Sequence, residues 1–239
     1  MTADVPPGKE LEYPGKELEA MASASHYRRW IVQSFEPFLG ARIAEVGAGI
    51  GSITRILLER PLERLVAFEP STNMFPHLDR VVAGHANARA VNAFFGGEQA
   101  GQDYDSVAYI NVLEHVEHER EELVAAYNAL RPGGHLLVFV PALAWLYSNF
   151  DREVGHYRRY SRDGLERVVA RAGFEVVRSR YFDVAGVLPW YLYFTLMGRG
   201  MGKGSVSLYD RVVVPPMRVV EGWVVPPLGK NVLLVARRN

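Results

Sequence analysis

A short apolar strand that runs directly into a glycine-rich loop is the feature that most limits how this chain can fold. Residues 43–51 read Ile-Ala-Glu-Val-Gly-Ala-Gly-Ile-Gly, and the segment after them has the apolar spacing of a helix. Glycines at alternate positions let the backbone approach a ligand closely, because a Cβ would obstruct it. The free N–H groups at the start of the helix can face the same ligand. The pattern therefore predicts a ligand site at the end of this strand.

Two details of the loop bear on the ligand. The spacing is G-x-G-x-G, whereas dinucleotide-binding loops have G-x-G-x-x-G. An acid, Glu45, also lies two residues before the first glycine. A carboxylate repels a pyrophosphate but attracts an ammonium group. The loop thus favours a ligand with an amino group over NAD or FAD.

Four segments in order resemble the motifs of class I S-adenosylmethionine-dependent methyltransferases. They are residues 45–51, 65–71, 104–116 and 130–139, and the resemblance extends over about residues 25–180. It implies that the cofactor is S-adenosyl-L-methionine, that the product is S-adenosyl-L-homocysteine, and that the chain is an enzyme. An NAD-dependent oxidoreductase is the residual alternative, which the glycine spacing disfavours.

Strands and helices are expected to alternate along the chain, as in an α/β protein. Strands are predicted at 42–46, 64–68, 88–92, 105–110, 134–140, from 174, and at 232–236; helices are predicted at 25–39, 52–60, 72–82, 117–130 and 163–172. This order indicates a parallel sheet with helices on both faces. The resemblance implies a Rossmann-like, doubly wound sheet of seven strands, mostly parallel, with an antiparallel last strand. Ligands of such sheets bind at the carboxyl ends of the strands.

We expect a single methyltransferase domain over residues 23–239, preceded by a flexible arm at 1–22. Residues 141–161 and 181–231 are expected to cover the active site, the second as a lid inserted before the last strand. So long a connection is usually functional. Its aromatic stretch, 181–194, is interrupted by Pro189 and is too short to span a bilayer. That stretch is interpreted as core or pocket wall, with a membrane-touching or dimer-forming patch as the alternative.

The resemblance assigns cofactor contacts to the strand ends. Glu69 would accept hydrogen bonds from the ribose hydroxyls, although it could instead be a first-turn charge of the next helix. Glu45 would interact with the methionine ammonium, or hold loop amides, and Asn111 would face the methionine part. The adenine contacts, Ala93 and Phe94, lack the acid that this family often has there. The full expected set is Tyr27, Glu45, Gly47, Ala48, Gly49, Gly51, Glu69, Pro70, Ala93, Phe94, Asn111, Val112 and Leu113.

The acceptor site is expected in the segment after the fifth strand. His156 and His115 are the candidate proton acceptors, because imidazole titrates near neutral pH. The candidate substrate contacts are Trp145, Tyr147, Tyr157, Arg158, Tyr181 and Trp190. In the structural alternative the tyrosines anchor the loop and its arginines pair with nearby acids. No metal is expected, because no H-E-x-x-H pattern is present and the acids near His115 complement a helix N-terminus.

Composition excludes several classes of function. The formal net charge is zero, which does not suit a general nucleic-acid grip, and there is no cysteine for disulfides or thiolate chemistry. The N-terminal residues lack the apolar core of a signal peptide, so we expect a cytoplasmic protein without a transmembrane segment. A homodimer is a further expectation.

The leading functional hypothesis is methyl transfer to N or O of a small aromatic or polycyclic metabolite. The aromatic residues of the two cover segments favour that acceptor. An amine acceptor can react without any base beyond solvent. Two alternatives remain: a lipid-linked or membrane-surface substrate, and a protein that binds S-adenosylmethionine without transferring its methyl group.

Overall fold

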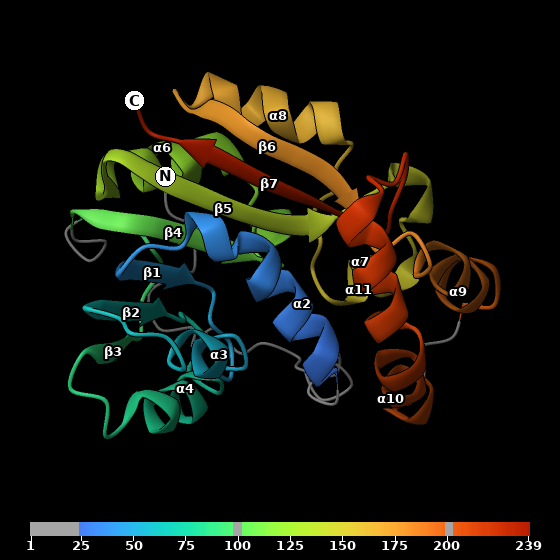
Figure 1. Ribbon diagram of the computed structural model, residues 1–239, viewed down its shortest axis with the longest axis horizontal. Coiled ribbons are helices and arrows are strands. Elements are labelled where there is room, and N and C mark those ends of the chain that lie inside the picture. Colours follow the sequence, from blue (N-terminus) through green and yellow to red (C-terminus); the bar gives the residue numbers. More distant parts are fainter. Residues whose placement is uncertain (1–23, 98–101, 199–202) are drawn as a thin grey trace.

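The computed structural model of the chain describes residues 24–97, 102–198 and 203–239. The arm expected at 1–22 and part of the glycine-rich stretch 198–204 lie outside these ranges. The centre of the fold is a seven-stranded sheet in the order β3-β2-β1-β4-β5-β7-β6 (Figure 1). The strands are β1 (Arg42–Val46), β2 (Arg64–Phe68), β3 (Ala88–Val91), β4 (Tyr104–Ile110), β5 (Leu130–Pro141), β6 (Glu175–Phe182) and β7 (Asn231–Arg237).

The central strands are buried on both faces, which explains why they appear in the sequence as continuous apolar runs. β1 pairs in parallel with β2 and β4, and β4 pairs in parallel with β5. β7 is antiparallel to both of its neighbours, β5 and β6. The expected doubly wound sheet with an antiparallel last strand is therefore confirmed.

Helices cover both faces of the sheet, as Figure 1 shows. They are α2 (Ser25–Phe35), η1 (Glu36–Phe38), α3 (Thr54–Leu57), α4 (Phe75–Val82), η2 (Leu113–His115), α6 (Glu119–Ala129), η3 (Ala144–Leu146), α7 (Asn149–Glu153), α8 (Arg162–Arg171), α9 (Val187–Trp190), η4 (Tyr191–Leu196), α10 (Lys203–Val212) and α11 (Val214–Trp223). Side chains of α6 and α8 form one core with β4 and β5. α2 and α11 pack on the opposite face, against β5 and β7.

Several elements differ from the sequence prediction; the helix expected at 52–60, for example, is limited to Thr54–Leu57. β5 already begins at Leu130, because Leu130 pairs with Tyr104 before the register with β4 shifts, so that His135 pairs with Ser106. β6 continues to Phe182, so Tyr181 is paired with Val232 inside the sheet. The aromatic stretch 181–194 is thus divided between a strand and the helices that follow it.

The described residues between β6 and β7 form four helices, α9, η4, α10 and α11, which lie together at one end of the sheet in Figure 1. α10 is joined to α2 by Asp210, whose carboxylate accepts hydrogen bonds from the backbone N–H of His26 and of Tyr27, at 3.1 and 2.8 Å. Among the described residues, none of the helices has the length and apolar character required to cross a bilayer.

Candidate functional site

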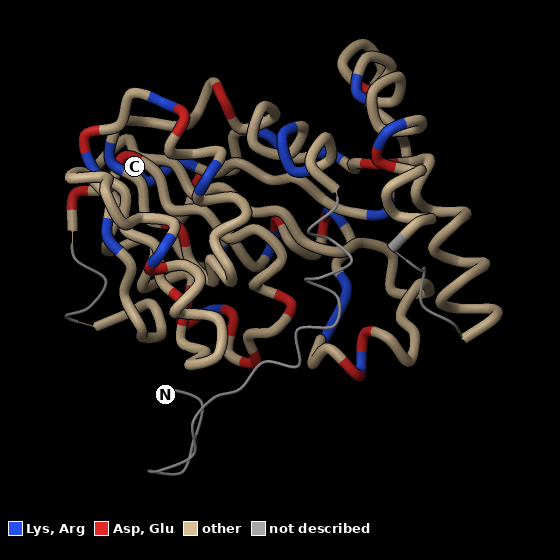
Figure 2. The backbone as a smooth tube through the Cα atoms, turned by 90° about the horizontal axis from the view of Figure 1, so that it is seen from below, with Lys and Arg blue, Asp and Glu red and all other residues tan. Residues whose placement is uncertain are grey.

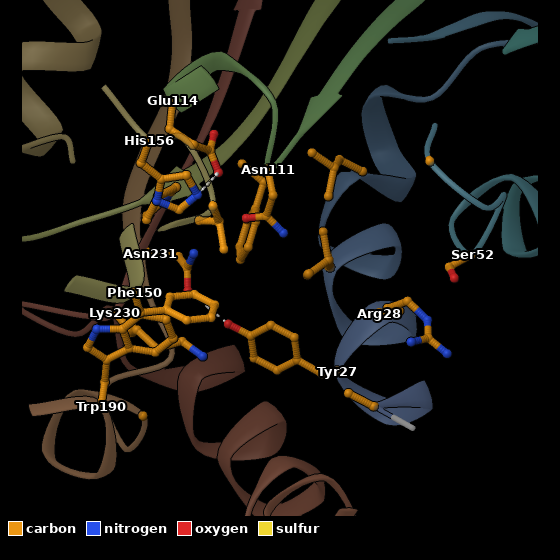
Figure 3. Close-up of a pocket in the computed structure, with 18 of the residues that line it drawn as sticks. Tyr27, Arg28, Ser52, Asn111, Glu114, Phe150, His156, Trp190, Lys230 and Asn231 are labelled. Atoms are coloured by element: carbon orange, nitrogen blue, oxygen red, sulfur yellow. Dashed lines mark hydrogen bonds and ion pairs between the residues drawn. The ribbon is translucent and has the colours of Figure 1, made fainter. Parts of the chain in front are cut away.

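A cavity of about 790 Å³ opens at the carboxyl ends of β1, β4 and β5. Its volume lies in the range of small-molecule sites, about 300–1,000 Å³. The glycine loop after β1 forms one end of the cavity, and residues from α7, α9 and the start of β7 form the other. Figure 3 shows side chains from these distant segments pointing toward one another, among them Tyr27, Asn111, His156 and Trp190. One continuous cavity therefore joins the expected cofactor end to the expected acceptor end.

At the cofactor end, the glycine loop is tied to the acid that ends β2. Gly47, Gly49 and Gly51 all have positive φ angles, which favour glycine. The Gly49 N–H donates to Glu69 Oε2 at 2.7 Å, and the Ser71 N–H donates to Glu69 Oε1 at 2.8 Å. Glu69 thus holds the loop in place. Because a carboxylate has about four lone-pair sites, it retains capacity for two hydroxyl donors.

Glu45 is buried beneath the same loop and lines the cavity. Its Oε2 accepts a hydrogen bond from Thr54 Oγ1 at 2.7 Å. Burial, together with the charge of Glu69, raises the pKa of Glu45 to about 8, although the Thr54 hydrogen bond opposes the shift. A neutral Glu45 carboxyl at physiological pH is therefore ready to lose a proton when an ammonium group arrives.

We expect the binding of S-adenosylhomocysteine to tighten as pH rises toward about 8, because the ligand's ammonium group selects the ionised form of Glu45. Below that pH, binding should release a proton. Calorimetry in buffers of different ionisation enthalpy measures this release directly. The Glu45→Gln variant, which has no proton to lose, should show a flatter pH dependence. An affinity that does not change with pH in the wild type would contradict the prediction.

The remaining expected cofactor contacts divide into two groups. Tyr27, Ala48 and Asn111 line the cavity, and Asn111 has a φ of 54°. Gly51, Glu69, Pro70, Ala93, Phe94, Val112 and Leu113 are not among the residues that line it, although Glu69 contacts the lining residue Gly49. Phe94 is 46% exposed, whereas Leu113 is fully buried in the core. Val112 packs so closely on Gly47 that a Cβ there would lie 2.6 Å from a Val112 methyl group.

At the other end of the cavity, His156 is held by a buried ion pair. Its Nδ1 lies 2.8 Å from Asp151 Oδ1. Arg159 donates to both carboxylate oxygens of Asp151, at 2.8 and 3.2 Å. Burial alone would raise the pKa of Asp151, but the hydrogen bond from His156 and the charge of Arg159 lower it. An ionised Asp151 accepts from Nδ1–H of the histidine, which leaves Nε2 as the basic nitrogen.

Glu114 and His115, which belong to η2, lie beside His156. His156 Nε2 is 3.9 Å from Glu114 Oε1, and neither carboxylate oxygen of Glu114 has a hydrogen-bond partner. Burial raises the pKa of Glu114 to about 7, although the charge of His156 lowers it. Burial, with His156, lowers the pKa of His115 to about 4. The latter value leaves His115 neutral at physiological pH.

These three side chains could also hold a metal ion, a possibility that the sequence did not suggest. One ligand atom from each of Glu114, His115 and His156 can be chosen so that all lie within 4.8 Å of one another. His118, three residues after His115, is not part of this group. Instead, the fold brings His156 to η2 from the loop after α7, through the backbone hydrogen bond from Tyr157 N–H to the Glu114 carbonyl at 2.9 Å.

Five of the six expected substrate contacts do not line the cavity, and Trp190 is the one that does. Trp145 is 55% exposed, and Tyr157 is 54% exposed. Tyr147 donates its hydroxyl to the His156 carbonyl at 2.7 Å, and Arg158 pairs with Glu119 at 2.9 Å. Tyr181 lies within β6 and accepts from the Arg162 N–H. These residues thus stabilise or cover the loop.

The acceptor end contains residues that sequence reasoning did not single out. Lys230 and Asn231 line the cavity, and Asn231 Oδ1 accepts from the Tyr27 hydroxyl at 2.9 Å (Figure 3). Lys230 Nζ lies 3.0 Å from Asp183 and 4.7 Å from the centre of the Tyr27 ring. Phe150 joins them from α7. Asn231, at the start of β7, pairs with Pro141, at the end of β5, and this pairing brings Lys230 to the cavity. The antiparallel last strand expected from the sequence already implied that these two strand ends meet.

The residues present fit S-adenosylmethionine. A buried acid faces the loop where the ammonium group is expected, and Glu69 retains acceptor capacity at the end of β2. Asn111 closes β4 and projects into the cavity between the two ends (Figure 3). Glu45, Gly49, Glu69 and Asn111 would hold the cofactor.

Comparison with known proteins agrees with this geometry. Residues 21–179 match the family described as "Methyltransferase domain". The chain is 28% identical over 137 residues to the ubiquinone biosynthesis O-methyltransferase of Xanthomonas axonopodis pv. citri, a match that covers 54% of each protein. The chain thus matches about half the length of this curated relative.

Solved structures show the same fold. The methyltransferase in the complex with the Haloferax volcanii Trm112 methyltransferase activator has a TM-score of 0.65 and 12% identity, over 94% of both chains. An S-adenosylmethionine-dependent methyltransferase of Thermotoga maritima has a TM-score of 0.61 and 16% identity, over 94% of this chain and 95% of the other.

Proposed function

This chain belongs to the methyltransferase domain family, with S-adenosylmethionine as its cofactor, and we propose that it transfers the methyl group to an oxygen or nitrogen of an aromatic acceptor. The continuity of the cavity from the glycine loop to the Asp151–His156 pair carries this proposal. When bound, S-adenosylmethionine supplies an electrophilic methyl group on a sulfonium. The protein must align the acceptor with that methyl group. It must also take up the proton that the acceptor loses.

Aromatic side chains supply the positioning surface of the acceptor end. Phe150 and Trp190 have ring centres 5.5 Å apart, and Trp190 stacks on Phe194 at 4.2 Å. All three line the cavity. Such a wall favours a planar, apolar acceptor, because aromatic pairs gain about 0.5–1.5 kcal/mol beyond the area that they bury.

The geometry of His156 favours oxygen as the acceptor atom. Asp151 holds Nδ1, so Nε2 can accept the hydroxyl proton, and the nearby Glu114 carboxyl can stabilise the imidazolium that forms. An amine would not require this base. The curated relative from Xanthomonas is named as an O-methyltransferase, which also supports oxygen.

The proposal is tested by incubating the protein with S-adenosylmethionine labelled in its methyl group and a protein-free extract of small molecules. We expect label to appear in one product that separates by chromatography. Glu69→Gln should bind S-adenosylhomocysteine at least about tenfold more weakly, because a charge-assisted hydrogen bond contributes about 1.5–3 kcal/mol.

Glu63→Ala is the matched control for Glu69→Gln, since Glu63 is an exposed acid shortly before β2. It should retain both binding and transfer. If S-adenosylhomocysteine binds to the wild type while no aqueous or organic fraction becomes labelled, the protein binds the cofactor without transferring its methyl group.

A further inference from the structure

The helices between β6 and β7 carry most of the exposed apolar surface of the described chain. These exposed side chains are Leu188, Tyr191, Tyr193, Leu196, Met197, Leu208, Val212, Val219, Val220, Trp223, Val224, Val225 and Leu228. Trp223, at the end of α11, is 88% exposed. Monomeric soluble proteins rarely expose large contiguous apolar patches, and those that occur mark interaction sites. We call these side chains the apolar surface of the insert.

The charges of the insert are asymmetric. By sequence, residues 184–230 contain five basic residues and two acidic residues. Both acids are buried: Asp210 accepts from the start of α2, and Glu221 pairs with Arg180 at 3.1 Å. In the described part of this segment, the exposed charged side chains are Arg211 and Arg218, and both are basic. α9 and η4 have no charged residue, and their tube is uniformly tan in Figure 2.

This combination matches the interface of an anionic bilayer. Tryptophan and tyrosine favour the level of the lipid headgroups, where one part of the ring is apolar and another is hydrated. Tyr191, Tyr193 and Trp223 are all exposed on the insert. Basic side chains next to them are attracted to anionic headgroups. A second copy of this chain fits less well, because a symmetric contact through this surface would place the basic Arg211 and Arg218 of both copies in one interface, where the described part of the insert offers no exposed acid to pair with them.

The apolar surface of the insert is also continuous with the acceptor end of the cavity. Pro189, Trp190 and Phe194 line the cavity, whereas Leu188, Tyr191 and Leu196 on the same two helices are exposed. One side of α9 and η4 therefore faces the acceptor, and another faces outward. A membrane surface that contacted the outward side would lie next to the cavity.

We propose that the insert docks on the surface of a bilayer that contains anionic lipids, and that the acceptor is an aromatic headgroup on a lipid chain. The docking follows from the exposed surface alone, while the acceptor class rests on the proposed methyl transfer. The cavity holds the reacting ring, and the apolar surface of the insert contacts the lipid phase from which the acceptor comes.

The test is flotation of the purified protein with vesicles of phosphatidylcholine, with and without phosphatidylglycerol. We expect the protein to float with the anionic vesicles, and less so at high salt. A Leu196→Ser/Trp223→Ser variant should bind these vesicles at least about tenfold more weakly, because each change removes a large exposed apolar side chain. Val124→Ser, at an exposed position on α6, is the matched control and should bind as the wild type does.

Three outcomes would overturn the docking proposal. One is a wild type that remains unbound with both kinds of vesicle. Another is equal binding by the Leu196→Ser/Trp223→Ser variant and the wild type. The third is a dimer, seen by sedimentation velocity, that this variant abolishes while no vesicle binding occurs, since the surface would then belong to a second copy. Calorimetry with S-adenosylhomocysteine on the same variants reports folding and the cofactor site, so failure of docking and failure of the proposed function are distinguished.

The acceptor class has its own readout. In the labelling assay, a lipid-linked acceptor should carry the label into the organic phase, and added anionic vesicles should raise the rate. Label found only in water-soluble products would overturn the lipid-linked acceptor while leaving the proposed methyl transfer in place.

Discussion

Replacing Asp151 with alanine is expected to lower the free energy of unfolding by about 3–5 kcal/mol, the usual cost of removing one partner of a buried ion pair. The Asp151 side chain is fully buried, and its partner Arg159 has a side chain that is only 1% exposed. Asp151 also forms a capping box with Ser148 at the start of α7. The variant therefore leaves a buried guanidinium unpaired and removes a helix cap. Urea unfolding measures the loss.

The control for this change is Glu153→Ala, which removes an exposed acid from the same short helix. It should alter stability by less than about 0.5 kcal/mol. The pH dependence provides a second test. Because the pKa of Asp151 is lowered in the folded state, its stabilising effect is present above its unfolded pKa and is lost as pH falls through the folded value. The difference between variant and wild type should shrink in acid. A loss below about 1 kcal/mol at neutral pH would show that Arg159 finds another partner.

Replacing His156 with glutamine is expected to lower kcat for an oxygen acceptor by about 10²–10⁴, the range attributed to general base catalysis. Nε2 of the histidine faces Glu114 and the cavity, and a glutamine amide cannot take up the proton of the acceptor. The affinity for S-adenosylhomocysteine should stay close to the wild-type value, because the glycine loop and Glu69 are untouched. Single-turnover transfer of labelled methyl measures the rate.

His118→Gln is the matched control, since His118 is exposed before α6 and does not line the cavity. It should transfer methyl groups at the wild-type rate. If His156→Gln instead raises KM and leaves kcat unchanged, His156 positions the acceptor and does not receive its proton. An amine acceptor would also give this result, since it needs no dedicated base.

Much of the fold could be read from the sequence because local patterns determine it. β1 and β2 have the bounds that we predicted, and α4 (Phe75–Val82) lies within the predicted helix. The errors arise where pairing with a distant strand decides the structure. Tyr181 was expected in the acceptor site because it begins an aromatic run, but β7 extends β6 as far as Phe182.

The two ends of the cavity differ in how well the sequence predicted them. At the cofactor end, Glu45 lies in β1, Gly49 follows β1 and Glu69 follows β2, and these two strands are adjacent in the sheet, so the proximity of the three residues follows from the strand order. At the acceptor end, the sequence did not show which of the many aromatic and basic residues line the cavity. Arg158 and Arg159 are neighbours in the sequence, yet one pairs with Glu119 near the surface and the other with buried Asp151. Only the three-dimensional path of the loop separates them.

By itself, the sequence determined the class of the fold and the chemistry of the glycine loop, because strand periodicity, glycine spacing and the acids at strand ends are local properties. The tertiary structure alone decided which side chains meet across long distances. It brought His156 to Glu114 and Lys230 to Tyr27. It also buried both acids of the insert while leaving Trp223 exposed. Burial and contact between distant segments result from the packing of the whole chain, and no local pattern encodes them.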